Sequence, residues 1–237
     1  MLNRIRSLAD TLIFPRSCEI CSSVLPASNP GLCRACESNL RWIRAPHCVA
    51  CGRTVTAENQ RCAECASEHF HFDRAYACVY YEEPVKKLLH LYKFGGRKVL
   101  KKFFSGVVDR FIHEHFRHML FDVVVSVPLD KKKERERGFN QSRLLSAHVS
   151  RQLGLIEATD KLRRRETTAP QSRLGKAERR RNVKGCFEVL DPGFFRLKKI
   201  LLVDDILTTG QTASECAHAL KNAGAAWVTA LACARGV

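Results

Sequence analysis

One short segment, residues 203–212, combines the side chains needed to hold a phosphorylated sugar. It reads Val-Asp-Asp-Ile-Leu-Thr-Thr-Gly-Gln-Thr and follows an apolar run that predicts a buried strand. The strand would deliver Asp204 and Asp205 to its carboxyl end, where open α/β sheets bind ligands and where carboxylates can hold sugar hydroxyls. Hydroxyls, a flexible backbone and the first amides of the next helix suit a phosphate. The residues that supply them are Thr208, Thr209, Gly210, Gln211 and Thr212.

A pair of aspartates after a strand also opens receiver domains, where it binds magnesium near the start of the fold. Too few residues follow Asp205 to complete a receiver domain, and the threonines would have no role in one. We therefore interpret residues 203–212 as a phosphate-binding loop.

Cysteines form the second chemical feature, because eight of the twelve fall into four Cys-x-x-Cys pairs. Two such pairs supply the four thiolates of a tetrahedral zinc site, so four pairs predict two closed, structural zinc ions. Disulfides and an iron-sulfur cluster are the competing interpretations, and both fit the regular spacing less well. Sequential pairing is the simplest arrangement, although the sequence also allows an interleaved one. The expected ligands are Cys18, Cys21, Cys33, Cys36, Cys48, Cys51, Cys62 and Cys65.

The elements that position these residues change in character after Cys65. Residues 1–70 are predicted to form a short N-terminal helix and a double zinc ribbon with a small core of Phe14, Trp42 and Ile43. Residues 71–237 show alternating strand and helix patterns, which predict an α/β fold with a mostly parallel sheet flanked by helices. The expected strands are 74–81, 121–127, 199–203 and 227–232, and the expected helices are 85–94, 100–112, 141–153 and 212–223.

Charge favours anionic partners. Lysine and arginine number 40 against 24 acidic residues, which gives a net charge of +16. Three basic clusters, Lys131 to Lys133, Arg163 to Arg165 and Arg179 to Arg181, could contact the phosphates of single-stranded nucleic acid, although solvated loop charge is an equal alternative. Residues 161–185 as a whole are predicted to form an exposed, mobile loop. No apolar run is long enough to insert into a membrane, and a cytoplasmic protein is expected.

Residues 203–212 closely resemble the phosphoribosyl pyrophosphate motif of type I phosphoribosyltransferases. Residues 127–129 and 135–141, with several residues between 165 and 182, resemble the ComF family, whose members also carry a double zinc ribbon. This resemblance covers nearly the whole chain. It implies a type I phosphoribosyltransferase-like fold and a role in natural transformation, the uptake of DNA as a single strand.

The resemblance also implies roles for individual residues. Asp204 and Asp205 would bind the ribose hydroxyls, and residues 208–212 would wrap the 5′-phosphate. A pyrophosphate loop would include Val127, Pro128 and Leu129, with a magnesium ion bridging pyrophosphate and sugar oxygens. Basic residues could neutralise the pyrophosphate or bind nucleic acid. These are Lys131, Lys132, Lys133, Arg135, Arg137, Arg163, Arg164, Arg165 and Arg179.

Three functions remain open from the sequence. The chain could bind phosphoribosyl pyrophosphate and single-stranded DNA, or it could transfer the phosphoribosyl group to an unidentified small-molecule acceptor in nucleotide metabolism. It could also be an adaptor whose zinc module docks a helicase or a DNA-uptake protein. The sequence contains no recognisable pocket for a nucleobase and no glutaminase domain, so ligand binding is better supported than catalysis.

Overall fold

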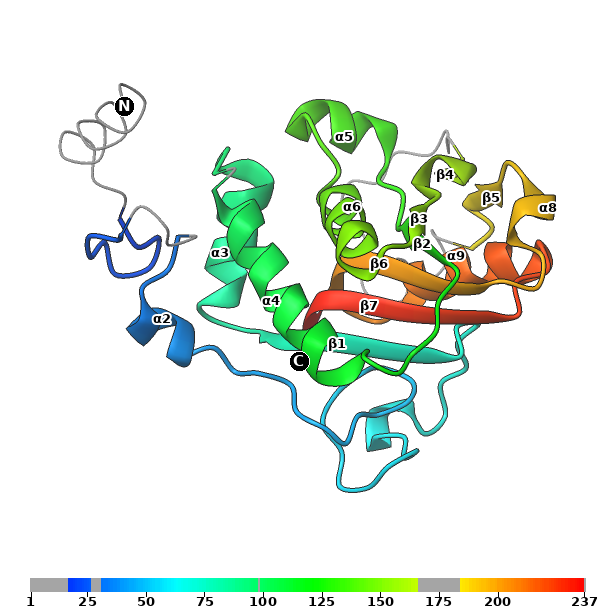
Figure 1. Cartoon of the computed structure of the whole chain (residues 1–237), viewed down its shortest axis with the longest axis horizontal. Helices are drawn as coiled ribbons and strands as arrows, with labels where there is room; N and C mark the ends of the chain where they lie inside the picture. Colours follow the sequence, from blue (N-terminus) through cyan, green and yellow to red (C-terminus); the bar gives the residue numbers. More distant parts are fainter. Residues whose placement is uncertain (1–16, 27–30, 98, 166–183, 237) are drawn as a thin grey trace.

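A five-stranded parallel sheet forms the centre of the molecule (Figure 1). The computed structural model describes residues 17–26, 31–97, 99–165 and 184–236. Across the sheet, the strands are β1 (Arg74–Tyr81), β7 (Trp227–Gly236), β6 (Lys199–Leu207), β2 (Val123–Ser126) and β3 (Ile156–Glu157), and each neighbouring pair is parallel. Parallel sheets are covered on both faces, which explains why β2 and the first half of β6 are almost continuously apolar and buried. The predicted α/β class is confirmed.

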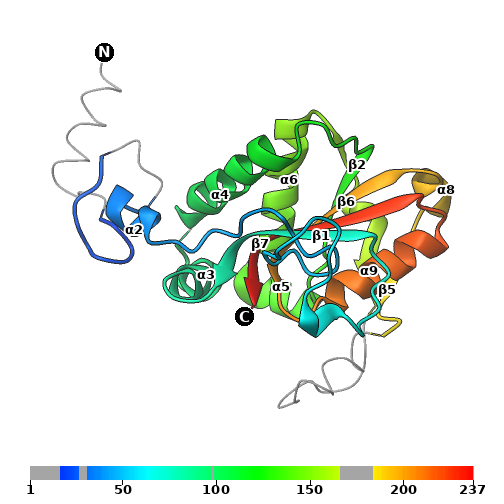
Figure 2. The same ribbon diagram turned by 90° about the horizontal axis from the view of Figure 1, so that it is seen from below.

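Helices cover both faces of this sheet (Figure 2). One face carries α3 (Val85–Phe94), α4 (Leu100–His115) and α6 (Gln141–Leu153), whose apolar residues join Val124, Leu201 and Val203 in one core. The other carries α9 (Gln211–Asn222) and α8 (Pro192–Phe195), which pack on Val125 and Leu202. Successive residues of β2 and β6 therefore face opposite cores, as strand geometry requires.

The basic stretch after β2 is a helix, although none of the helices expected from the sequence includes it. This helix, α5 (Lys131–Arg137), begins at Asp130, whose carboxylate accepts hydrogen bonds from the amides of Lys132 and Lys133 at 3.0 and 3.3 Å. It ends at Gly138 with φ +77°, a left-handed conformation that glycine adopts at little cost. Good caps at both ends define a short helix without any buried residue.

The predicted loop 161–185 also contains regular structure. Its first residues form η2 (Thr159–Lys161) and β4 (Leu162–Arg164), and β4 pairs antiparallel with β5 (Phe187–Val189). Residues 166–183 lie outside the described part of the chain.

Three strands differ in length from the prediction, including β7, which continues to Gly236 against a predicted end at residue 232. β6 continues to Leu207, because it keeps pairing with β7 as far as Leu207 opposite Arg235. Asp204 and Asp205 are therefore part of the strand, and the loop after it is correspondingly shorter. β2 is limited to Val123–Ser126, against a predicted 121–127.

The later part of the cysteine-rich segment, from Arg41 to Val49, lies along the outer edge of β1; the segment also includes the short helices α2 (Arg34–Ser38), which lies away from the sheet, and η1 (Ala63–Cys65). The Ile43 amide donates to the Cys78 carbonyl at 2.9 Å, and the Ala75 amide donates to the Val49 carbonyl at 3.2 Å. The separate core predicted for Trp42 and Ile43 is wrong: Ile43 is buried in the core on the α9 face, and Trp42 packs against the core on the α4 face. Phe14, the third predicted member, lies outside the described residues.

Within the described part of the chain, no helix combines the length and the apolar character needed to cross a membrane.

Candidate functional site

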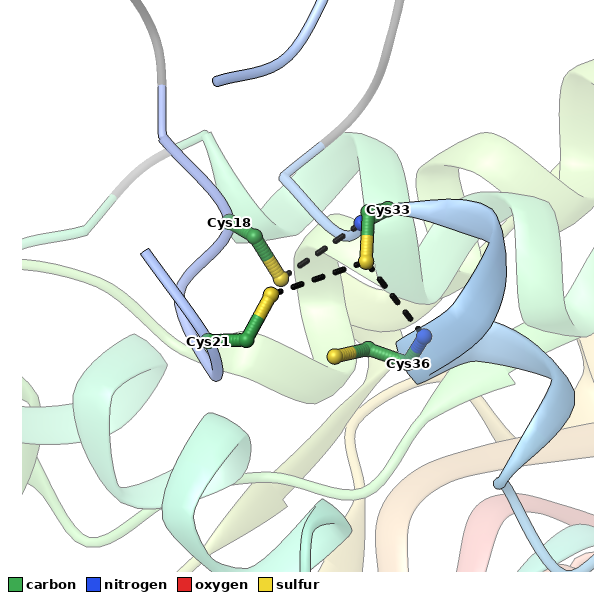
Figure 3. Close-up of side chains that lie close together, drawn as sticks. All are labelled: Cys18, Cys21, Cys33 and Cys36. Carbon is green, nitrogen blue, oxygen red and sulfur yellow. Dashed lines mark hydrogen bonds between the residues drawn. The ribbon is translucent and has the colours of Figure 1, made fainter. Parts of the chain in front are cut away.

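The first four-cysteine group brings together the sulfurs of Cys18, Cys21, Cys33 and Cys36 (Figure 3). Cys21 Sγ and Cys33 Sγ lie 3.7 Å apart, and the Cys33 and Cys36 amides point at sulfur atoms, at 3.5 Å from Cys18 Sγ and 3.4 Å from Cys33 Sγ. Zinc–sulfur bonds of about 2.3 Å in a tetrahedron place sulfurs about 3.8 Å apart. The group fits a structural zinc ion.

The second group consists of Cys48, Cys51, Cys62 and Cys65, and all its sulfurs lie within 4.8 Å of one another. Cys51 Sγ and Cys62 Sγ are 3.7 Å apart, as a tetrahedral site requires. The two groups are thus sequential along the chain. Hydrogen bonds favour the thiolate form in both groups: those from Ser23 lower the pKa of Cys21 to about 6, one from the Cys36 amide lowers the pKa of Cys33, and one from Cys51 lowers the pKa of Cys48 to about 4. Thiolates are the form that binds zinc.

The acidic pair occupies the carboxyl-terminal half of β6. Asp204 Oδ1 accepts hydrogen bonds from Ser142 Oγ and from the Asp205 amide, both at 2.8 Å. Asp205 Oδ2 lies 2.6 Å from Lys93 Nζ at the end of α3. Burial, together with the negative charge of Asp205, raises the pKa of Asp204 to about 7. The surroundings therefore stabilise the ionised form of the pair poorly. An additional cation, or hydrogen bonds from sugar hydroxyls, would stabilise it.

The predicted pyrophosphate loop, residues 127–130, is tied to the acidic pair through the start of α6. Asn140 Nδ2 donates to the Val127 carbonyl at 3.1 Å, and Asn140 Oδ1 accepts from the Ser142 amide at 3.0 Å. Because Ser142 also holds Asp204, one short network connects the ends of β2 and β6. Ser126 Oγ and Gln141 Nε2, at the same end of the sheet, are buried without a hydrogen-bond partner. Unpaired buried groups of this kind are often satisfied by a ligand.

The threonine-rich loop runs from Thr208 to the start of α9. Gly210 caps α9 with φ +79°, and the Gln211 amide points at Thr209 Oγ1 at 3.4 Å. Arg235 holds the strand end through hydrogen bonds from Nη1 to the carbonyls of Leu207, at 2.8 Å, and Thr208. The amides at the beginning of α9 give this loop an electropositive character that suits a phosphate.

The predicted basic residues do not all gather at this site. α5 directly follows the 127–130 loop and exposes Lys131, Lys132, Lys133 and Arg135. The guanidinium of Arg137 lies 4.6 Å from the centre of the exposed Phe94 ring and donates to Gln141 Oε1 at 3.3 Å.

The charge of the second predicted basic cluster, residues 163–165, is partly neutralised by an acidic residue. Arg163 and Arg165 both form ion pairs with Glu188 of β5, the latter at 3.1 Å, while Arg164 faces the Phe187 ring. Arg163 and Arg165 point to one face of the strand and Arg164 to the other, because successive side chains of a β-strand alternate between its faces. Arg179 lies outside the described residues.

Three residues of the site escaped the sequence analysis: Lys93, Asn140 and Ser142. Asn140 stands within the segment that resembles the ComF family, so the resemblance could have indicated it. Lys93 lies far from the acidic pair in the sequence and reaches Asp205 from the end of α3, which packs against β1 and α4, and no local pattern reveals this contact.

Five parallel strands, helices on both faces and two four-cysteine groups define an α/β protein with a double zinc ribbon. A family model described as a double zinc ribbon domain matches residues 9–79. The chain is 30% identical over 224 residues to the DNA utilization protein YhgH of Escherichia coli K12, covering 92% of this chain and 96% of that protein. The chain therefore belongs to the ComF family.

Two further relatives support this assignment. Competence protein F of Haemophilus influenzae is 28% identical, with 87% of this chain and 91% of that protein covered. Competence protein ComFC of Streptococcus pneumoniae is 30% identical, with 82% and 83% covered. Likeness to solved structures is weaker. Adenine phosphoribosyltransferase from Thermoanaerobacter pseudethanolicus aligns with 64% of this chain and 85% of its own at 13% identity, with a TM-score of 0.38.

Proposed function

We propose that the chain binds phosphoribosyl pyrophosphate with magnesium at the carboxyl ends of β6 and β2. The observation that carries the proposal is a hydrogen-bond network from Asp204 through Ser142 and Asn140 to Val127. This network fixes the position of the acidic pair relative to the 127–130 loop. Ribose hydroxyls would bind at Asp204 and Asp205, the 5′-phosphate at residues 208–212, and the pyrophosphate at residues 127–129. Magnesium would offset the negative charge that the acids and the pyrophosphate bring together.

The proposed biological role is in the cytoplasm, in the handling of single-stranded DNA during DNA uptake. The names of the relatives, competence proteins and a DNA utilization protein, support this role. The net charge of +16 and the exposed cations of α5 support contacts with DNA phosphates. A helicase or another DNA-uptake protein would be a further partner.

Titration calorimetry with phosphoribosyl pyrophosphate, with and without magnesium, tests the ligand. We expect binding that depends on magnesium and that raises the melting temperature by mass action. Release of pyrophosphate on addition of nucleobases would favour the alternative function, transfer of the phosphoribosyl group to a small-molecule acceptor. Absence of binding at millimolar ligand would contradict the proposal.

Single-stranded DNA should bind with little sequence preference and with an affinity that falls steeply with salt. The slope of the logarithmic plot is roughly −0.7 for each phosphate neutralised on a single strand. Replacing Lys132 and Lys133 by glutamine should therefore flatten the slope by up to about 1.4, as measured by fluorescence anisotropy across a salt series.

A matched control removes two cations at the opposite end of the strands, where β6 begins. Arg196→Gln with Lys199→Gln changes the net charge equally, near the amino end of β6. The slope of this variant should stay close to that of the original protein. Equal effects of both variants would show that only the total charge matters, and would contradict a DNA surface on α5.

A further inference from the structure

The second cysteine group is built against the threonine-rich loop, although the two are far apart in the sequence. Phe70, just after Cys65, packs against this cysteine group and stacks on Phe72 with ring centres 4.9 Å apart. Its ring also covers Gly210, where an added Cβ would lie 3.0 Å from Phe70 Cε1. Phe70 therefore touches the metal-binding segment on one side and the loop on the other.

Arg53 makes a second, independent connection. It follows the Cys51 knuckle, pairs with Glu64 of η1 at 2.5 Å, and is largely buried, with 16% of its side chain exposed. Its Nη2 donates to the Gly236 carbonyl at 3.2 Å. Gly236 lies against Thr208, whose Cα would be 3.3 Å from an added Cβ, and its neighbour Arg235 binds the Thr208 carbonyl.

The chain leaving the second group is also attached to α9. The His71 amide donates to Ser214 Oγ at 3.0 Å, and the His71 and His218 rings lie 4.2 Å apart. The residues that flank the second group thus contact the end of β7 beside Thr208, Gly210 in the loop and the helix after it.

The first cysteine group contacts a different region. Glu19 pairs with Arg97 at 3.7 Å, and Gly31 lies against Leu100 at the start of α4. In the described residues, no hydrogen bond, ion pair or ring contact joins this group to residues 208–212. The two ribbons therefore differ in what they support, although their cysteine spacing is nearly the same.

We propose that the second ribbon is a structural part of the phosphate site, in which Arg53 and Phe70 are positioning residues for residues 208–212. This inference rests on the proposed function, because it assigns the loop a phosphate ligand. Ordering a loop on binding costs conformational entropy for each residue fixed. A loop that is already held in its bound conformation avoids this cost. Removing the residues that hold it should therefore weaken binding, although no atom that touches the ligand is removed.

The test uses Arg53→Gln and Phe70→Leu in the full chain, with Glu19→Gln as the matched control in the first ribbon. Each variant is checked for two zinc ions per chain. Titration calorimetry with phosphoribosyl pyrophosphate and magnesium should show about 10-fold or weaker affinity for Arg53→Gln and Phe70→Leu, and unchanged affinity for Glu19→Gln. Hydrogen exchange of the amides at 208–212 without ligand should accelerate in the first two variants alone. Arg53→Lys retains the charge opposite Glu64 but lacks the guanidinium fork, so it should recover only part of the affinity.

The two proposals fail in different ways. If the original protein does not bind the ligand, the proposed function fails, and the exchange rates at 208–212 still test the support of the loop. If the original protein binds, and zinc-loaded Arg53→Gln and Phe70→Leu show unchanged affinity and unchanged exchange, the inference about the second ribbon is overturned. Equal weakening by Glu19→Gln would also overturn it, because the effect would then be general destabilisation.

Discussion

Replacing Asp204 and Asp205 together by asparagine should weaken magnesium-dependent binding of phosphoribosyl pyrophosphate by at least about 100-fold. Hydrogen bonds to a charged group contribute about 1.5–3 kcal/mol each, and a loss of about 3 kcal/mol corresponds to slightly more than a factor of 100. Asparagine keeps the shape of aspartate and can still accept the Ser142 hydroxyl, so the change removes charge rather than volume. Titration calorimetry measures the effect directly.

The fold should survive this substitution. The raised pKa of Asp204 indicates that its ionised form is poorly stabilised, so the neutral amide removes an unfavourable charge, while Lys93 loses its ion pair with Asp205. The melting temperature without ligand should therefore change little at neutral pH. Asp122→Asn is the matched control, because Asp122 accepts the Lys199 amide at 2.7 Å at the opposite end of β6. Unchanged ligand affinity in the double variant would refute the assignment of the acidic pair.

Local patterns predicted the elements that frame the site. The ends of β1, α3 and α6 agree with the expected ranges 74–81, 85–94 and 141–153, because apolar periodicity and capping glycines act over a few residues. The segment for which we propose phosphate binding, residues 203–212, stood out for the same reason, since its acids, threonines and glycine lie close together in the chain.

The remaining features depend on contacts between distant segments. α5 has no buried residue, so no apolar periodicity marks it, and only its caps at Asp130 and Gly138 define it. The extension of β6 to Leu207 depends on its pairing with β7. The cysteine spacing predicted two zinc sites but left sequential and interleaved pairing open, and it did not indicate that the second ribbon lies along β1. The roles assigned to residues 127–129 and to the basic residues remain predictions.

The second prediction with a large expected effect concerns the zinc ligands of the second ribbon. Cys48→Ser should leave about one zinc ion per chain and unfold the second ribbon, because a serine hydroxyl is a poor zinc ligand and the remaining three thiolates cannot close the site. Apparent binding energies of structural zinc in small peptides are about 10–16 kcal/mol, so much of the folding free energy of such a ribbon depends on the ion. Cys48 is fully buried, and its neighbour Val49 pairs with Ala75 of β1. The loss should therefore lower the melting temperature of the whole chain.

Two control variants show whether the lower melting temperature comes from the loss of zinc. Cys216→Ser changes an equally buried cysteine that belongs to neither group, so it should retain two zinc ions. Cys21→Ser affects the first group, where the side chain is exposed, and should also remove one ion, but with a smaller effect on the melting temperature because that group packs at the edge of α3 and α4. Elemental analysis gives the zinc content, and thermal unfolding of the same samples gives the melting temperature. Two zinc ions retained by Cys48→Ser would refute the second site, since the metal would then have to be held by ligands outside the four cysteines.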